Sequence, residues 1–147
     1  MIESMDAQRQ QLTETSDRLR SLLAPQSGQR NDAWNRKVTR VLADFEAQFR
    51  GYVQAKNRGG FLLPVLEQRP TQAPAVDRLG FRNEQVMNRL HRLCTTVDAA
   101  QTKTERTSAH QPDRLHRLLD EVCRIEEEEN ELVLRVFCTE IGYPASC

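Results

Sequence analysis

The sequence predicts an all-α fold, a four-helix bundle of up-down-up-down topology that takes residues 1–147 as one domain. Apolar residues recur at helical spacing in four long segments, and no segment alternates in the manner of a strand. Pro or Gly lies between these segments. At 147 residues the chain has the length of a single domain that buries its own core.

The first helix is predicted over residues 3–24, which contain neither Gly nor Pro. Met5, Leu12, Leu19 and Leu23 mark one face of it, and this face also passes through two polar positions. We therefore expect a helix that turns a mostly apolar face toward the core.

The second helix is predicted over residues 33–57. Residues 25–31, PQSGQRN, separate it from the first helix, and Asp32 is a suitable N-cap. Gly59 and Gly60 end it. Its core face is expected to carry Val38, Leu42, Phe45 and Phe49.

The rest of the chain predicts a corner and two more helices. Residues 61–72 are short and marked by Pro, so we expect a turn of helix and a corner that covers the end of the bundle. A third helix is expected from Ala73, with Pro74 in its first turn, and a fourth from the residues after Pro112 to about Glu140. Their core faces are Val76, Leu79, Val86, Leu90, Leu93 and Val97, then Leu118, Val122, Ile125, Leu132 and Val136.

Each predicted helix also carries polar residues on its core face. These are Arg9 and Ser16, Tyr52 and Lys56, Asn83, and Glu129. Counting about 1.5 Å per residue along antiparallel helices puts Tyr52, Asn83 and Glu129 at similar depth, with Arg9 closer to them than Ser16. Residues 126–128 are also acidic but can face solvent. A buried carboxylate needs a metal, a cation or a proton, so Glu129 is the central candidate.

Two segments carry a family resemblance. Residues 56–79, KNRGGFLLPVLEQRPTQAPAVDRL, and residues 128–134, EENELVL, resemble the corresponding segments of bacterial hemerythrin-like (HHE cation-binding) domains. In that family the second helix carries His-x-x-x-Glu before a Gly-Gly turn, the third a His, and the fourth His-x-x-x-Glu before Asn-Glu-Leu. The resemblance implies a hemerythrin-like bundle over most of the chain.

The resemblance also implies which positions replace the family's metal ligands. Tyr52, Asn83 and Ile125 stand where the family has histidines. Lys56 and Glu129 stand at its glutamates, so Glu129 is the one retained ligand. The motif's di-iron chemistry is therefore expected to be lost, and no cofactor is expected.

The first-helix position stays open between two residues. The segment TSDRLRSLL, residues 15–23, favours Ser16 as the replaced histidine, whereas depth along the helix favours Arg9.

The substitutions suggest what takes the place of the metal. Imidazoles and bridging carboxylates hold a di-iron centre, whereas Ile125 cannot coordinate an ion and a charged Lys56 repels one. We predict a buried contact between Lys56 and Glu129, direct or through one water, with Asn83 and Tyr52 supplying the remaining hydrogen bonds. Arg9 is a rival cation for Glu129, because a guanidinium can bind a carboxylate with two hydrogen bonds.

Three functions follow from these residues. The first is a non-enzymatic, metal-free relative of hemerythrin-like domains with a binding or regulatory role. The second is a hemerythrin-like iron- or oxygen-handling protein that uses Glu129 and other carboxylates. The third is a helical interaction module that dimerises through Phe61, Leu62 and Phe81. The sequence contains no Gly-x-Ser-x-Gly motif, and no Cys has a core-face His to activate it.

The composition limits the classes of partner that we expect. Lys plus Arg number 21 and Asp plus Glu 21, with Arg spread among acids and no internal repeat apparent, so nucleic acid is not expected. No apolar run approaches the roughly 18 residues of a membrane span, so we expect no signal peptide, no membrane anchor and a cytoplasmic protein. The expected partner is an unidentified protein or small ligand, and the expected state is a monomer or homodimer.

The cysteines and histidines offer no metal pattern. Cys94 and Cys123 are expected to be small buried apolar side chains. Cys138 and Cys147 could pair in an oxidising setting. The histidines at positions 91, 110 and 116 lie off the predicted core faces.

Overall fold

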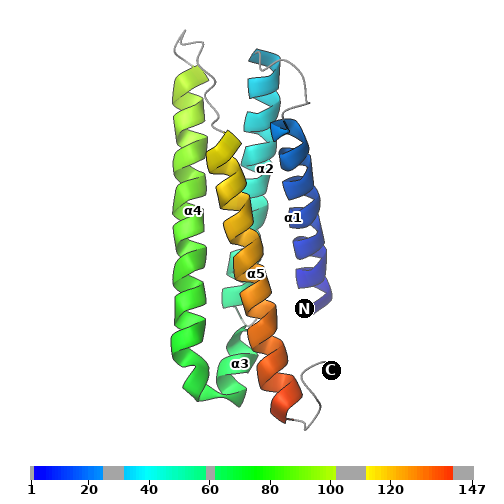
Figure 1. The fold of residues 1–147 in the computed structure, drawn as a ribbon, viewed down its shortest axis with the longest axis vertical. Coiled ribbons are helices and arrows are strands. Elements are labelled where there is room, and N and C mark those ends of the chain that lie inside the picture. Colours follow the sequence, from blue (N-terminus) through cyan, green and yellow to red (C-terminus); the bar gives the residue numbers. More distant parts are fainter. Residues whose placement is uncertain (1, 25–31, 59–61, 102–111, 141–147) are drawn as a thin grey trace.

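The computed structural model describes residues 2–24, 32–58, 62–101 and 112–140, and its elements are helices (Figure 1). Within these residues there is no strand, so the predicted all-α class is confirmed. The elements are α1 (Ile2–Leu23), α2 (Asp32–Asn57), α3 (Leu62–Gln68), the short 3-10 helix η1 (Pro70–Gln72), α4 (Ala73–Gln101) and α5 (Pro112–Glu140).

The four long helices begin and end close to their predicted limits. Asp32 lies in the first turn of α2 and Asp113 in the first turn of α5, where a carboxylate is stabilised by the positive end of the helix dipole. Pro112 opens α5, because the fixed φ of proline suits a first helical position. Local sequence signals thus account for these helix starts.

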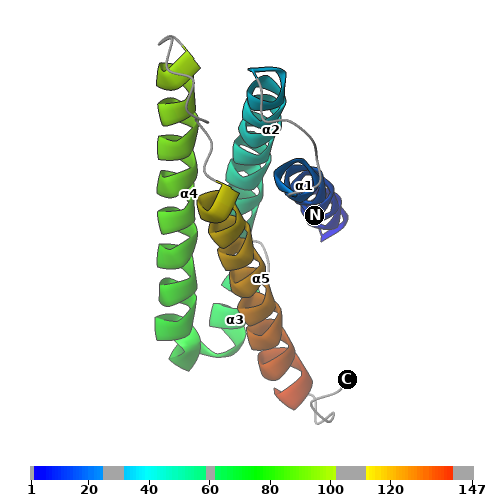
Figure 2. The same cartoon turned by 45° about the horizontal axis from the view of Figure 1, so that its top comes forward.

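The long helices lie side by side and alternate in direction in Figure 1, where α1 and α4 run upward and α2 and α5 run downward. Helix α2 contacts α1 and α4, and α5 contacts α4 and α1. Figure 2 shows the same neighbours after a turn of the molecule, and in both views α5 leans away from α4 toward its C-terminal end. This arrangement brings the inward faces of four helices around one core.

Helix α3 covers the lower end of the molecule, in line with the predicted turn and corner. It contacts α2, α4 and α5 there (Figure 1). Leu62 and Val65 are its buried residues. Leu62 therefore cannot belong to an exposed dimerisation surface, because it packs into the core instead; Phe81 is exposed, and Phe61 lies outside the described residues.

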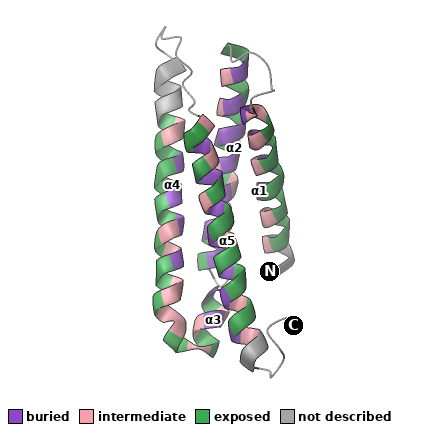
Figure 3. Cartoon of the chain, in the orientation of Figure 1, coloured by how far each residue is buried: buried purple, intermediate pink, exposed green. Residues whose placement is uncertain are grey.

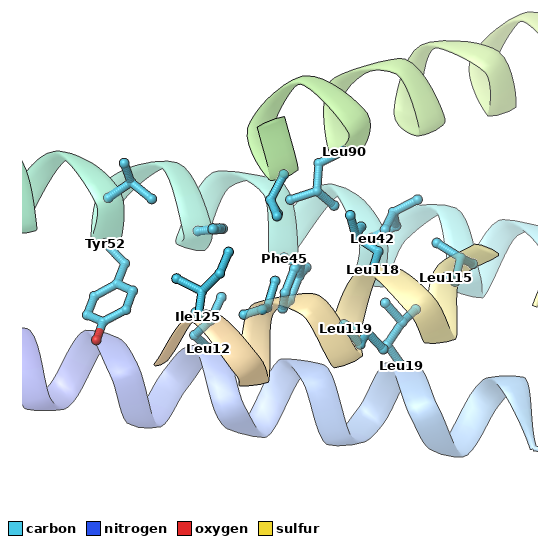
Figure 4. Packing of buried hydrophobic residues seen from close by; sticks show 14 of the residues in the cluster. Leu12, Leu19, Leu42, Phe45, Tyr52, Leu90, Leu115, Leu118, Leu119 and Ile125 are labelled. Carbon is cyan, nitrogen blue, oxygen red and sulfur yellow. The ribbon is translucent and has the colours of Figure 1, made fainter. Parts of the chain in front are cut away.

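One apolar core runs between the helices, because each turns a buried stripe inward (Figure 3). Figure 4 shows residues from α1, α2, α4 and α5 meeting there, among them Leu19, Phe45 and Leu90. The Phe45 and Phe49 rings meet edge to face, with centroids 6.2 Å apart and planes at 75°. This geometry is favoured for aromatic pairs and fixes two successive turns of α2.

The buried face of α1 differs from the predicted one. It carries Leu12, Thr15 and Leu19, whereas Ser16 is only half-buried. Thr15 and Ser16 both lie three or four residues from Leu12 and from Leu19, so helical spacing allows either one on the core face. The packing of α1 against its neighbours buries Thr15. The Thr15 hydroxyl donates to the carbonyl of Gln11 at 3.0 Å, which satisfies it inside the core.

The described helices include none with the length and apolar character needed to cross a lipid bilayer. Cys94 is partly buried and Cys123 is exposed, and neither forms a disulfide. The expectation of burial is therefore wrong for Cys123, because it follows the buried Val122 and faces outward. Cys138 and Cys147 lie outside the part of the chain whose side chains are described, and so does His110.

Candidate functional site

A buried ion pair joins α2 to α5. Lys56 lies one turn beyond Tyr52 on the core face of α2, and Glu129 lies one turn beyond Ile125 on α5. Lys56 Nζ is 3.0 Å from Glu129 Oε1 and 3.1 Å from Oε2. Lys56 is 2% exposed and Glu129 0%. The predicted direct contact is therefore confirmed, and a single ammonium neutralises both carboxylate oxygens.

Asn83 brings α4 into the same cluster. Its amide Nδ2 donates to Glu129 Oε2 at 3.3 Å. Lys56 Nζ donates to Asn83 Oδ1 at 3.5 Å, so the amide uses its donor and its acceptor at once. Three helices are thus joined by a closed set of hydrogen bonds in the core.

Tyr52 completes the surroundings of the ammonium. Lys56 Nζ lies 4.6 Å from the centroid of the Tyr52 ring, within the range of a cation–π interaction. Figure 4 shows the ring extending from α2 toward α1, with its hydroxyl oxygen at the far end. The face of the ring therefore contacts the charge, while the hydroxyl interacts with the side chain of Glu126.

Glu126 joins this cluster, contrary to the expectation that residues 126–128 face solvent. It is half-buried, and its Oε1 is buried with no hydrogen-bond partner among the described residues. Glu127 and Glu128 are exposed as predicted. Glu126 precedes Glu129 by three residues, so both side chains lie on neighbouring positions of one helix face.

The surroundings in the cluster raise the pKa of two groups, the Tyr52 hydroxyl and the Glu126 carboxyl. Burial, followed by the negative charges of Glu126 and Glu129, raises the pKa of the Tyr52 hydroxyl well above its ordinary value. Burial also raises the pKa of the Glu126 carboxyl, although the positive charge of Lys56 and the Tyr52 hydroxyl oppose this rise. Both shifts favour the protonated, uncharged forms.

The two candidates on α1 lie at different distances from the cluster. The positive charge of Arg9 acts on Tyr52 and Glu126, so Arg9 lies at the level of the cluster. Ser16 lies seven residues further along, about 10 Å away. Arg9 does not bind Glu129 as the rival cation; its guanidinium is 3.4 Å from Asp6 and its side chain is 41% exposed.

Ile125 does not take part in the polar cluster. It is 1% exposed and packs within the apolar core (Figure 4). Of the positions singled out from the sequence, Tyr52, Lys56, Asn83 and Glu129 come together, Arg9 lies beside them, and Ile125 and Ser16 do not join. The sequence signal that would have found Glu126 is its three-residue spacing from Glu129.

The cluster's donor set does not fit a di-iron centre. Lys56 Nζ contacts both carboxylate oxygens of Glu129. These are the oxygens through which a carboxylate would bind metal ions. Within the described residues, no three His, Cys, Asp or Glu side chains gather closely enough to hold a metal ion. The arrangement can join three helices through a charge-neutral contact, and it leaves the half-buried Glu126 free to titrate.

No family model, curated protein or solved structure matches this chain.

Proposed function

We propose that the chain is an up-down-up-down bundle of the hemerythrin-like type whose metal centre has been replaced by ordinary side chains. In this proposal it is a non-enzymatic, metal-free scaffold with a binding or regulatory role. The observation that supports it is the contact of Lys56 Nζ with both oxygens of Glu129.

The positions involved strengthen the proposal. The resemblance assigns Lys56 and Glu129 to facing glutamate ligands of two metal-binding helices. These same side chains meet in the core as an ion pair, with Asn83 and Tyr52 from histidine-equivalent positions around them. An ammonium group in place of a metal cation supplies the neutralising charge that a buried carboxylate requires.

A metal assay tests the proposal directly. We expect purified protein to contain no stoichiometric transition metal by elemental analysis, even after incubation with ferrous iron under anaerobic conditions. We also expect ferrous iron and a chelator to leave the Tm unchanged, since a metal that binds the native state raises Tm by mass action. Stoichiometric iron with an oxo-bridge absorption band would reverse the proposal.

A restored site tests the ancestry. The substitutions Tyr52→His, Lys56→Glu, Asn83→His and Ile125→His, made together, return four family ligands beside Glu129. We expect this variant to bind cobalt(II) with a visible spectrum, and more tightly when Arg9→His is added than when Ser16→His is added. The matched control adds Glu129→Gln, which removes the retained ligand and should weaken cobalt binding.

A second candidate has one observation in its favour. Glu126 and Glu129 lie together, and a buried oxygen of Glu126 lacks a hydrogen-bond partner among the described residues. A hemerythrin-like protein that handles a metal through carboxylates would use these two groups. The same elemental analysis separates this candidate from the metal-free scaffold.

A further inference from the structure

Two copies of the same five-residue sequence lie in neighbouring helices. Residues 89–93 of α4 and residues 114–118 of α5 both read Arg-Leu-His-Arg-Leu. The two helices contact each other and run in opposite directions (Figure 1). The two copies therefore bring the same residue types to the contact between α4 and α5, in opposite chain directions.

A pocket of about 410 Å³ lies between the two copies. Its lining consists of the first, fourth and fifth residue of each copy: Arg89, Arg92, Leu93, Arg114, Arg117 and Leu118. The four Arg side chains supply positive charge and the two Leu side chains supply an apolar surface. Among the described residues the lining includes no acid, whereas the sequence suggested that the Arg residues are spread among acids.

Three of these arginines differ from Arg82, which lies on the same pair of helices. Arg82 of α4 lies 2.9 Å from Glu121 and also pairs with Glu128. Among the residues that the structure describes, no carboxylate pairs with Arg89, Arg114 or Arg117. Like charges brought around one concave surface repel one another, and a bound anion relieves that repulsion.

We propose that this pocket binds a small ligand that carries two or more phosphate groups. Guanidinium groups bind phosphate oxygens through paired, charge-assisted hydrogen bonds. One phosphate group carries a charge of about −2, so balancing the three positive charges of Arg89, Arg114 and Arg117 requires at least two.

A small ligand fits the surroundings better than a nucleic acid does. The basic residues surround one concave pocket with Leu93 and Leu118 in its wall, as in small-molecule sites. The whole chain has a formal net charge of zero, which gives no extended basic surface for a polymer. The pocket residues of α4 lie about 9–15 Å along the helix from Asn83 and include no member of the ion-pair cluster, so this proposal stands independently of that cluster.

Calorimetric titration of the full chain with inorganic tripolyphosphate, at low and at physiological salt, tests the proposal. We expect saturable binding of one ligand per chain. The double variant Arg89→Gln with Arg117→Gln removes one Arg from each copy, and we expect it to weaken Kd at least about tenfold, since each hydrogen bond to a charged group contributes on that order. Tripolyphosphate should raise the Tm of the original chain and not of this variant.

The matched control is Arg36→Gln with Arg40→Gln, which removes the same charge from exposed positions of α2. We expect its Kd to stay within about twofold, because those residues do not line the pocket. Arg89→Lys with Arg117→Lys keeps the charge but loses paired hydrogen bonds, so it should bind with intermediate affinity. No saturable binding, or equal weakening by the pocket and control pairs, would overturn the proposal. Tighter binding of a single-stranded oligonucleotide that both pairs weaken equally would overturn it too, in favour of general surface charge.

Discussion

Lys56 and Glu129 depend on each other because both are almost fully buried. Each charge lost its water on folding, and the other charge replaces part of that solvation. Asn83 then satisfies one carboxylate oxygen that the ammonium shares. The cluster's stability therefore resides in the pair rather than in either residue.

Removing one partner should cost far more than removing both. We expect Lys56→Met and Glu129→Leu each to lower the free energy of unfolding by about 3–5 kcal/mol, because each leaves an uncompensated charge in the core. The double variant should lie within about 1 kcal/mol of the original chain, since its two apolar side chains can pack together. Urea denaturation of the four proteins measures this.

The partly exposed pair of Arg50 and Glu46 supplies the control. These groups lie 2.9 Å apart, but the Arg50 side chain is 49% exposed. Arg50→Met should cost less than about 1 kcal/mol, because water screens the interaction. A Lys56→Met, Glu129→Leu double variant as unstable as the sum of its single variants would show that the two residues act separately.

Glu126 should make stability depend on pH. Burial raises the pKa of its carboxyl above the ordinary 4.5, so the folded state holds this proton more tightly than the unfolded state. The stabilisation is fully present below pH 4.5 and is lost as pH rises through the folded-state pKa. Glu126→Gln removes this loss, so relative to the original chain the variant should become more stable as pH rises from 4 to 8.

An exposed glutamate on the same helix supplies the control for this pH experiment. Lys56 and Arg9 oppose the rise in the Glu126 pKa, and Glu129 adds to it. Glu127 is exposed on the same helix, so Glu127→Gln should leave the pH profile of Tm unchanged. The same profile for both variants would mean that Glu126 is not the group that titrates.

At the scale of the helix, α4 contains a residue that weakens it. Gly80 lies inside α4, and a Cβ added there meets nothing within 4 Å. Gly80→Ala should raise the free energy of unfolding by about 0.5–1 kcal/mol, because alanine loses less backbone entropy on helix formation. The exposed Ala47→Gly in α2 should lower it by a similar amount, and chemical denaturation measures both.

Ion pairs on the flanks connect helices around the core. Arg20 of α1 lies 2.9 Å from Asp120 of α5, and Arg82 of α4 lies 2.9 Å from Glu121 of α5. Such partly exposed pairs contribute little energy each, about 0–1 kcal/mol. They favour one rotation of each helix over its alternatives, and thereby help to hold the buried stripes toward one another.

For the whole molecule, the shared core predicts cooperative unfolding. The buried apolar residues form one cluster that includes α1, α2, α4 and α5. Trp34 is the only Trp in the chain, and its indole Nε1 donates to the carbonyl of Leu22 at 2.8 Å, which ties α2 to α1. Trp fluorescence therefore reports on one helix pair, whereas far-UV circular dichroism reports on all helices.

These two probes should give the same unfolding transition. A single cooperative step is expected for a domain of this size with one core. Separate midpoints in urea would mean that the α1–α2 pair opens independently of α4 and α5. In that case the ion pair of Lys56 in α2 with Glu129 in α5 does not make the α1–α2 pair unfold together with α4 and α5.

Periodicity in the sequence was sufficient to predict the four long helices and the polar residues on their core faces, and the family resemblance led to the predicted contact between Lys56 and Glu129. A residue's position along a helix follows from local chemistry, and a carboxylate on an apolar stripe must be neutralised. It was not sufficient for Glu126 and Thr15, which lie at the edges of their stripes. Their burial depends on the rotation of each helix about its own axis, and a difference of a few tens of degrees exposes or buries them. Many weak contacts with neighbouring helices together fix that rotation.

The sequence by itself determined that this chain forms amphipathic helices with a charged residue inside, because helix formation and hydrophobic spacing are local properties. Only the tertiary structure decided how each helix is rotated, and with it some of the meetings between distant residues. It places Glu126 beside Tyr52, and Arg89 and Arg92 opposite Arg114 and Arg117. The reason is physical: side chains more than 20 residues apart in sequence become neighbours only when the packing of whole helices fixes their rotation and register.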